Sequence, residues 1–151
     1  MCIRDRYNKT IKKPSNPKRS KYIFCGWYSD SKLTKAWNFN NKITSGKTLY
    51  AKWKKISLKK ATISKMQNVS GRKLKVTVKK VSGADGYQIQ YSTKSNMKSA
   101  KNVSSSKTTT TISKLSKGKK YYVRVKAYKK DSTGKKVAGK WSKVKNLKVS
   151  K

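Results

Sequence analysis

Histidine and glutamate are absent from this 151-residue sequence, and its only acidic residues are four aspartates. Without histidine, the Ser-His-Asp and Cys-His pairs of nucleophilic enzymes cannot form. A carboxylate dyad or a calcium site needs acids that lie close together. Asp30, Asp85 and Asp131 instead fall in separate predicted turns, where we expect them to bond the backbone; the fourth is Asp5. The sequence therefore predicts no enzyme activity and no metal or cofactor site.

Cysteine and long apolar runs are equally scarce. The two cysteines, Cys2 and Cys25, cannot make a disulfide framework or a metal site with ligand spacing. Cys25 stands in the aromatic run YIFCGWY, and we expect its small side chain to be buried. No apolar run approaches the roughly 20 residues of a membrane-spanning helix, so no transmembrane segment is expected.

The N-terminal segment lacks a recognisable signal peptide. Residues 1–6, MCIRDR, resemble translated sequencing-adapter sequence, and we interpret them as a non-native leader; an ordinary basic leader is the alternative. A signal peptide would then have been lost by truncation. Residues 7–20 hold both prolines and no periodic pattern, which is typical of a linker or the remnant of a broken domain.

Positively charged residues dominate the composition of the chain. Lysine and arginine total 42, and the formal net charge is +38. Such a balance points to polyanionic surroundings: nucleic acid, a membrane surface or an anionic cell-wall polymer. Only five of the 42 are arginine, the residue best suited to reading bases. We therefore expect no specific nucleic-acid partner.

From residue 73 onward, short runs of alternating apolar and polar residues are separated by turn sequences such as SGADG and DSTGKK. This pattern predicts an all-β antiparallel sandwich. The predicted strands are KLKVTVKKV (73–81), GYQIQYS (86–92), TTTTIS (108–113), KYYVRVKAYK (120–129) and WSKVKNLKVS (141–150).

Period-two alternation assigns the two faces of these strands. The side chains expected in the core are Leu74, Val76, Val78, Tyr87, Ile89, Tyr91, Tyr121, Val123, Val125 and Ala127. The opposite face of 120–129 should expose Tyr122, Arg124, Lys126 and Tyr128. Outward cations form a candidate polyanion-facing surface: Lys73, Lys75, Lys79, Arg124 and Lys126. The alternative is that they serve only solubility and protection of the sheet edges.

Residues 21–54 are rich in tryptophan, with expected strands near 22–28 and 48–54. Trp27 and Trp53 are expected in a small core. For Trp37, a core position and stacking on a sugar ring both stay open, and Trp141 is expected to cap the sandwich edge.

Residues 56–151 resemble a fibronectin type III domain, most clearly in LSKGKKYYVRVKAY. The positions that match are Leu115, Gly118, Tyr121, Val123, Val125 and Ala127. The resemblance implies that Tyr121 is the tyrosine of the corner between the fifth and sixth strands. The sequence departs from the family at Val78, near which many members carry a core tryptophan.

Residues 17–53 resemble the C-terminal part of a Listeria–Bacteroides repeat, the internalin B type, through KYIFCGWY, Trp37 and the closing TLYAKW. The opening strand of the repeat is missing, and we interpret 21–55 as a truncated, small β module.

Both resemblances imply a monomeric, non-catalytic module that spaces or docks neighbouring domains of a secreted, cell-surface bacterial protein. Its expected partners are an anionic cell-wall polymer or a host surface glycan or protein. One alternative is an accessory module of a larger wall hydrolase or carbohydrate-active enzyme. The other is non-specific nucleic-acid binding, which is salt-sensitive.

Overall fold

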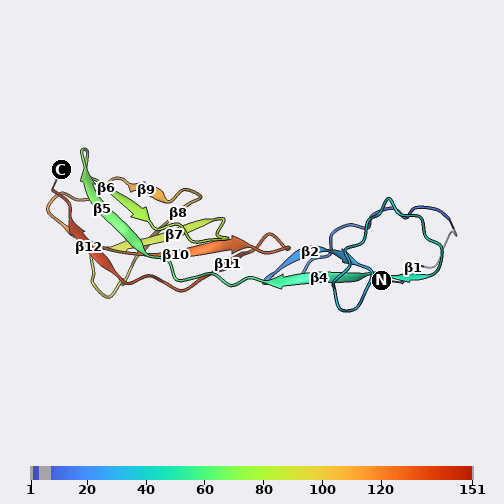
Figure 1. Cartoon of the computed structure of the whole chain (residues 1–151). Coiled ribbons are helices and arrows are strands. Elements are labelled where there is room, and N and C mark those ends of the chain that lie inside the picture. Colours follow the sequence, from blue (N-terminus) through green and yellow to red (C-terminus); the bar gives the residue numbers. More distant parts are fainter. Residues whose placement is uncertain (1, 4–7, 151) are drawn as a thin grey trace. The chain divides into compact units, whose positions relative to one another are not determined.

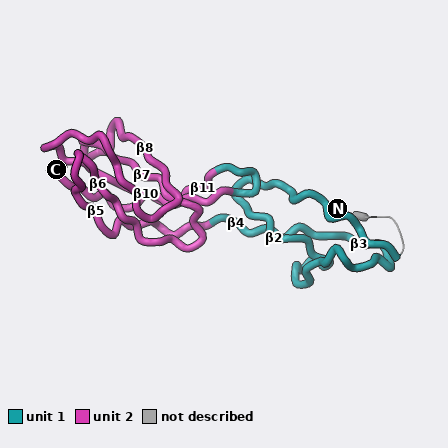
Figure 2. The backbone as a smooth tube through the Cα atoms, turned by 90° about the horizontal axis from the view of Figure 1, so that it is seen from above, with its two compact units in different colours: residues 1–56, 131–135 teal, residues 57–130, 136–151 magenta. Residues whose placement is uncertain are grey.

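A computed structural model describes residues 2–3 and 8–150, and the regular structure in them is β-strand throughout, as predicted (Figure 1). Of the predicted leader 1–6, only Cys2 and Ile3 are among the described residues; the rest of that prediction lies outside them. The chain divides into two compact units (Figure 2). Unit 1 comprises residues 1–56 and 131–135, and unit 2 comprises residues 57–130 and 136–151.

Unit 2 is a sandwich of two antiparallel sheets. One has the order β5-β6-β9, formed by β5 (Ile63–Val69), β6 (Lys73–Val78) and β9 (Thr109–Ile112). The other has the order β11-β10-β7-β8, with β12 also paired to β10. Its strands are β7 (Gly86–Ser92), β8 (Lys101–Ser105), β10 (Lys120–Lys130), β11 (Lys136–Ala138) and β12 (Lys145–Lys148).

The core of unit 2 follows from alternation along β6, β7 and β10. Leu74 and Val76 of β6 are fully buried, and so are Val123 and Val125 of β10. Their partner Ile89 of β7 lies opposite Val125 in the register and is also fully buried. Burying each such aliphatic side chain stabilises the fold by about 1.5–3 kcal/mol. The predicted inward faces of these strands are confirmed, although Tyr91 is only half-buried.

Tyr128 is a correction to the predicted outward face of β10, because only 9% of it is exposed. It pairs across the sheet with Gly86, which has no side chain. A Cβ atom at Gly86 would lie 2.6 Å from the Tyr128 hydroxyl, so the ring occupies the space that the glycine leaves. The Lys136 ammonium covers the ring at 4.4 Å from its centroid.

Asn68 joins the two sheets at one edge of the sandwich. Its side-chain Nδ2 donates to the Lys148 carbonyl at 2.9 Å, and its Oδ1 accepts from the Ser150 N–H at 3.2 Å. Asn68 belongs to β5 and Lys148 to β12, which lie in different sheets. One amide therefore fastens the last strand to the first strand of the sandwich.

Unit 1 is built on the antiparallel pair β2 (Tyr22–Tyr28) and β4 (Tyr50–Lys55), close to the two predicted strands. A second pair joins β1 (Cys2–Ile3) to β3 (Lys47–Thr48). The Phe24 ring meets Trp27 and Trp53 edge-on, each at 5.5 Å between centroids. Trp27 is buried and Trp53 is half-buried, which agrees with a small aromatic core.

The expectation that Cys25 is buried is wrong. The register of β2 against β4 shifts between Phe24 and Gly26, so Cys25 is the extra residue of a β-bulge. A bulge interrupts the alternation of faces, and the thiol is exposed as a free cysteine.

Candidate binding surfaces

The five predicted polyanion-facing cations are not brought together by the fold. Lys73 and Lys75 lie on β6, with Lys79 just beyond its end, in the three-stranded sheet. Arg124 and Lys126 lie on β10 in the other sheet. Because the two sheets pack through a shared core, their outer faces point in opposite directions. The cations therefore belong to two separate surfaces.

On the β10 surface, Trp141 is stacked with the two predicted cations. The Arg124 guanidinium lies 4.6 Å and the Lys126 ammonium 4.4 Å from the indole centroid. Arg124 Nε also donates to Gln90 Oε1 at 2.8 Å. The next residue anchors the segment, because the Ser142 N–H donates to the Val125 carbonyl at 2.7 Å. Trp141 thus covers β10 and orders its cations, and each contact contributes about 0.5–1 kcal/mol at an exposed site.

The predicted corner residues gather where β10 begins. The Tyr121 hydroxyl accepts a hydrogen bond from the Ser116 N–H at 3.1 Å, and Leu115 is buried. Gly118 has φ of +78°, a conformation that favours glycine, and its N–H donates to the Val149 carbonyl at 2.7 Å. These contacts give the residues a structural role in closing the sandwich.

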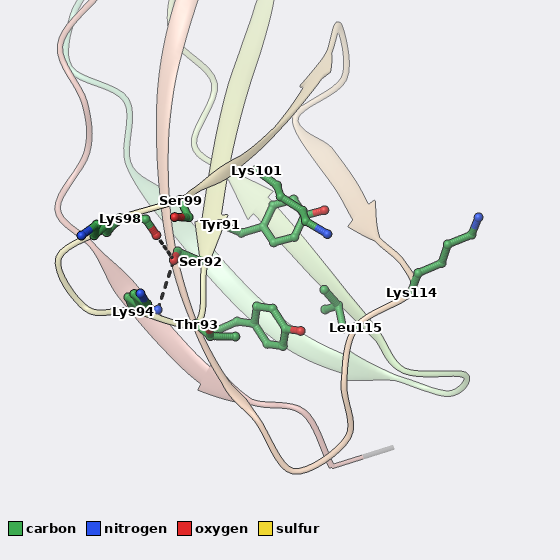
Figure 3. A pocket seen from close by; sticks show the side chains of 10 residues that line it. Tyr91, Ser92, Thr93, Lys94, Lys98, Ser99, Lys101, Lys114 and Leu115 are labelled. Atoms are coloured by element: carbon green, nitrogen blue, oxygen red, sulfur yellow. Dashed lines mark hydrogen bonds between the residues drawn. The ribbon is translucent and has the colours of Figure 1, made fainter.

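Beside this corner lies a cavity of about 240 Å³, which the sequence did not reveal (Figure 3). Tyr91 and Tyr121 line it together with Leu115, and their rings are 6.3 Å apart and tilted by 49°. Its other lining residues are polar or cationic: Ser92, Thr93, Lys94, Lys98, Ser99, Lys101 and Lys114. The run STKSNMKSAK carries most of these residues, but only the fold brings Lys114 and the tyrosines to it.

The three aspartates among the described residues all accept hydrogen bonds from backbone N–H groups, as expected. The Lys35 N–H lowers the pKa of Asp30, and the Lys130 N–H, with smaller effects of Lys129, lowers the pKa of Asp85. Lys129 Nζ and Asp85 Oδ1, 3.0 Å apart, form the one ion pair found in the described part of the chain.

The pKa of Asp131 is lowered to about 2, because its carboxylate accepts several hydrogen bonds. The largest effect comes from the Thr133 hydroxyl, followed by the Lys21 N–H at 2.8 Å. Among the described residues, no three His, Cys, Asp or Glu side chains gather as metal ligands would.

The indole N–H groups of Trp27 and Trp37 are buried and have no hydrogen-bond partner within residues 8–150. A ligand in solvent cannot reach a buried donor, so neither N–H group can donate a hydrogen bond to a sugar. Trp37 as a whole is half-buried. In the same part of the chain, no helix is long and apolar enough to cross a membrane.

Comparison with known proteins finds two families along the chain. Residues 60–140 match the fibronectin type III domain, and residues 5–52 match the Listeria-Bacteroides repeat domain. Both resemblances inferred from the sequence are confirmed. The repeat match reaches further toward the N-terminus than the module predicted over 21–55.

Two curated relatives come from Evansella cellulosilytica, and their names describe them as membrane proteins, one of them Gly-rich. They are 46% identical over 48 residues and 48% identical over 44 residues. These matches cover 31% and 28% of this chain, but only 6% and 7% of the relatives. The chain therefore matches a small part of much longer proteins.

Solved structures agree on the fold. The FN1–FN3 domains of chicken CNTN1 match with a TM-score of 0.52 and 20% identity, over 75% of this chain and 38% of that one. The sixth fibronectin type III domain of human fibronectin type III domain containing protein 3 matches with a TM-score of 0.51 and 17% identity. That match covers 64% of this chain and 90% of the human domain.

Proposed function

Because this chain belongs to the fibronectin type III family, we propose that it is a structural and adhesive module of a secreted bacterial surface protein. In this role it spaces or docks neighbouring modules near the anionic cell wall. Domains of this family are typically non-catalytic, and both matched families are typical of extracellular or surface proteins. The small share of the Evansella relatives that is matched also suits one module within a longer chain.

The observation that carries the docking role is the unpaired positive charge. The sequence has 42 cations against four acids, and one ion pair forms among the described residues. The cations Lys75 and Lys126 lie on opposite sheets, so both faces of the sandwich are basic. Such a surface attracts a polyanion at long range without selecting its sequence. A phosphate-rich wall polymer such as teichoic acid fits this requirement.

Retention of the full chain on teichoic-acid-bearing cell walls tests the proposal. We expect retention at low ionic strength that falls steeply between about 50 and 200 mM salt, as for other polyanion contacts. Walls from which teichoic acid has been stripped are the control and should retain much less protein. Binding that ignores salt, or no binding at low salt, would contradict the proposed role.

A further inference from the structure

We infer that the cavity beside the Tyr121 corner binds a phosphate group esterified to a short polyol. This inference deepens the proposed function and rests on it, because it gives one specific subsite within an otherwise diffuse cationic surface. The cavity lies wholly within unit 2, between the segment that joins β7 to β8 and the segment that leads into β10 (Figure 3).

The charge of the lining selects an anion. Four of the ten lining residues are lysines, and none of the ten is acidic. In Figure 3, Lys94 and Lys98 lie on one side of Tyr91 and Lys114 lies on the other, and the ammonium groups of Lys98 and Lys114 point away from the ring. An anion beside Tyr91 would draw these ammonium groups inward from two loops. Exposed lysines on long, flexible stems can close on it without backbone movement.

The lining cations can bind a phosphate group. All four are lysines, and arginine, whose planar fork pairs with carboxylate and phosphate alike, does not line this cavity. Lysine acts as a compact point charge with three donors, which suits the several oxygens of a tetrahedral anion. The hydroxyl groups of Thr93 and Ser99 line the same space and add neutral hydrogen-bonding groups.

The apolar wall suits the carbon chain of a polyol. Tyr91 and Tyr121, with buried Leu115, provide the aromatic and aliphatic surface of the cavity. A volume of about 240 Å³ is below the usual range for drug-sized ligands, about 300–1,000 Å³. The cavity is therefore matched to one small phosphorylated unit of a polymer.

The loop that carries two of the lysines is ordered before any ligand binds. The Ser92 hydroxyl donates to the Lys98 carbonyl at 2.8 Å and accepts from the Lys94 N–H at 3.1 Å. Met97 is buried, and the Asn96 side chain accepts from the Lys98 N–H at 3.0 Å. A loop fixed in this way loses little conformational freedom when a ligand binds.

Titration of the isotopically labelled full chain with glycerol 3-phosphate, followed by NMR, tests the inference. We expect shifts concentrated at residues 91–101 and 114–121, with weak affinity. Inorganic phosphate should bind more weakly at the same residues, because it cannot contact the rings, and glycerol alone should produce no localised shifts. Equal binding of inorganic phosphate would overturn the role of the rings.

A pair of charge-matched variants separates the subsite from diffuse attraction. Lys98→Gln/Lys101→Gln removes two lining lysines, and Lys65→Gln/Lys75→Gln removes two exposed lysines from the other sheet. We expect the first variant to weaken glycerol 3-phosphate binding by about three- to tenfold, the effect of two exposed charge contacts. The second variant should change it less than twofold.

Equal weakening by both variants would overturn the subsite but leave the proposed function standing. Failure of the unsubstituted full chain to bind teichoic-acid-bearing walls at low salt would instead refute the proposed function itself. Single-stranded DNA could instead shift the NMR signals of the same residues at a lower concentration of phosphate groups than glycerol 3-phosphate requires. That result would overturn the polyol assignment in favour of a nucleic acid.

Discussion

At the scale of single residues, one phenol oxygen holds the turn that leads into the longest strand. The Tyr121 hydroxyl accepts the Ser116 N–H at 3.1 Å while its ring is buried beside the core. Tyr121→Phe removes the acceptor and leaves the N–H without its partner. We expect a loss of about 1 kcal/mol in the free energy of unfolding, measured by urea denaturation of the full chain.

Tyr122→Phe is the matched control, because Tyr122 is the next residue of β10 and lies on the opposite, half-exposed face. Loss of this hydroxyl should change stability by less than about 0.5 kcal/mol. If both substitutions cost the same, the Tyr121 hydrogen bond would not be the source of the stabilisation.

Burial of individual residues could be predicted wherever alternation is regular. The inward positions of β10, Val123 and Val125, follow from period two alone. Cys25 and Tyr128 could not be predicted in this way. The first depends on a register shift against β4, and the second on a glycine that faces it from another strand. Both causes are non-local, so no window of sequence around either residue contains them.

At the scale of strands, those with regular alternation of apolar and polar residues were again the ones that could be predicted from the sequence. The sequence pattern predicted β6, β7, β9 and β10, but not β5, β8 or β11. A register shift between Ile63 and Lys65 breaks the alternation of β5, and β8 holds Val103 as its one apolar residue. Strand β11 has only three residues. The cavity beside the Tyr121 corner is harder still to predict from the sequence, because two separate loops form it.

Asp131, in the loop between β10 and β11, provides a prediction about how stability depends on pH. The folded pKa of Asp131, about 2, lies below the ordinary value of 3.8. As pH falls, Asp131 is therefore protonated at a higher pH in the unfolded chain than in the folded chain. The free energy of unfolding decreases as a result. The contribution of the ionised carboxylate is complete above about pH 4 and is lost as pH falls toward about 2. Urea denaturation at stepped pH should show this decline.

Asp131→Asn should lower stability at neutral pH and flatten the acid slope, because the amide cannot titrate. Some slope should persist, since Asp30 and Asp85 also have lowered pKa values. An Asp131→Asn chain that kept the full acid slope would exclude this carboxylate as its cause.

At the scale of the whole molecule, a net charge of +38 repels itself in the folded state. Salt screens this repulsion, and the Debye length shrinks from about 30 Å at 0.01 M to about 8 Å at 0.15 M. We therefore expect Tm to rise by several degrees across this range of sodium chloride, as followed by circular dichroism. An unchanged or falling Tm would mean that charge repulsion does not limit stability.

Repetition of the measurement on a chain whose lysine amines have been partly acetylated, which removes their charge, is the control. The net charge is then smaller, so the same addition of salt should raise Tm by a smaller amount. The two forms of the chain together separate screening of lysine charge from general effects of salt on apolar surface.

The Asn68 bridge has a mechanical consequence. In the proposed spacing role, the module would transmit tension along its backbone. A pull on the chain beyond Lys148 reaches the sandwich by two routes. One is the pair of hydrogen bonds of Asn68, which leads into β5, and the other is the bonding of Val149 and β12 to β10 and the turn before it. The load is therefore divided between both sheets from the start. The last strand cannot peel away from one sheet while the other stays unloaded.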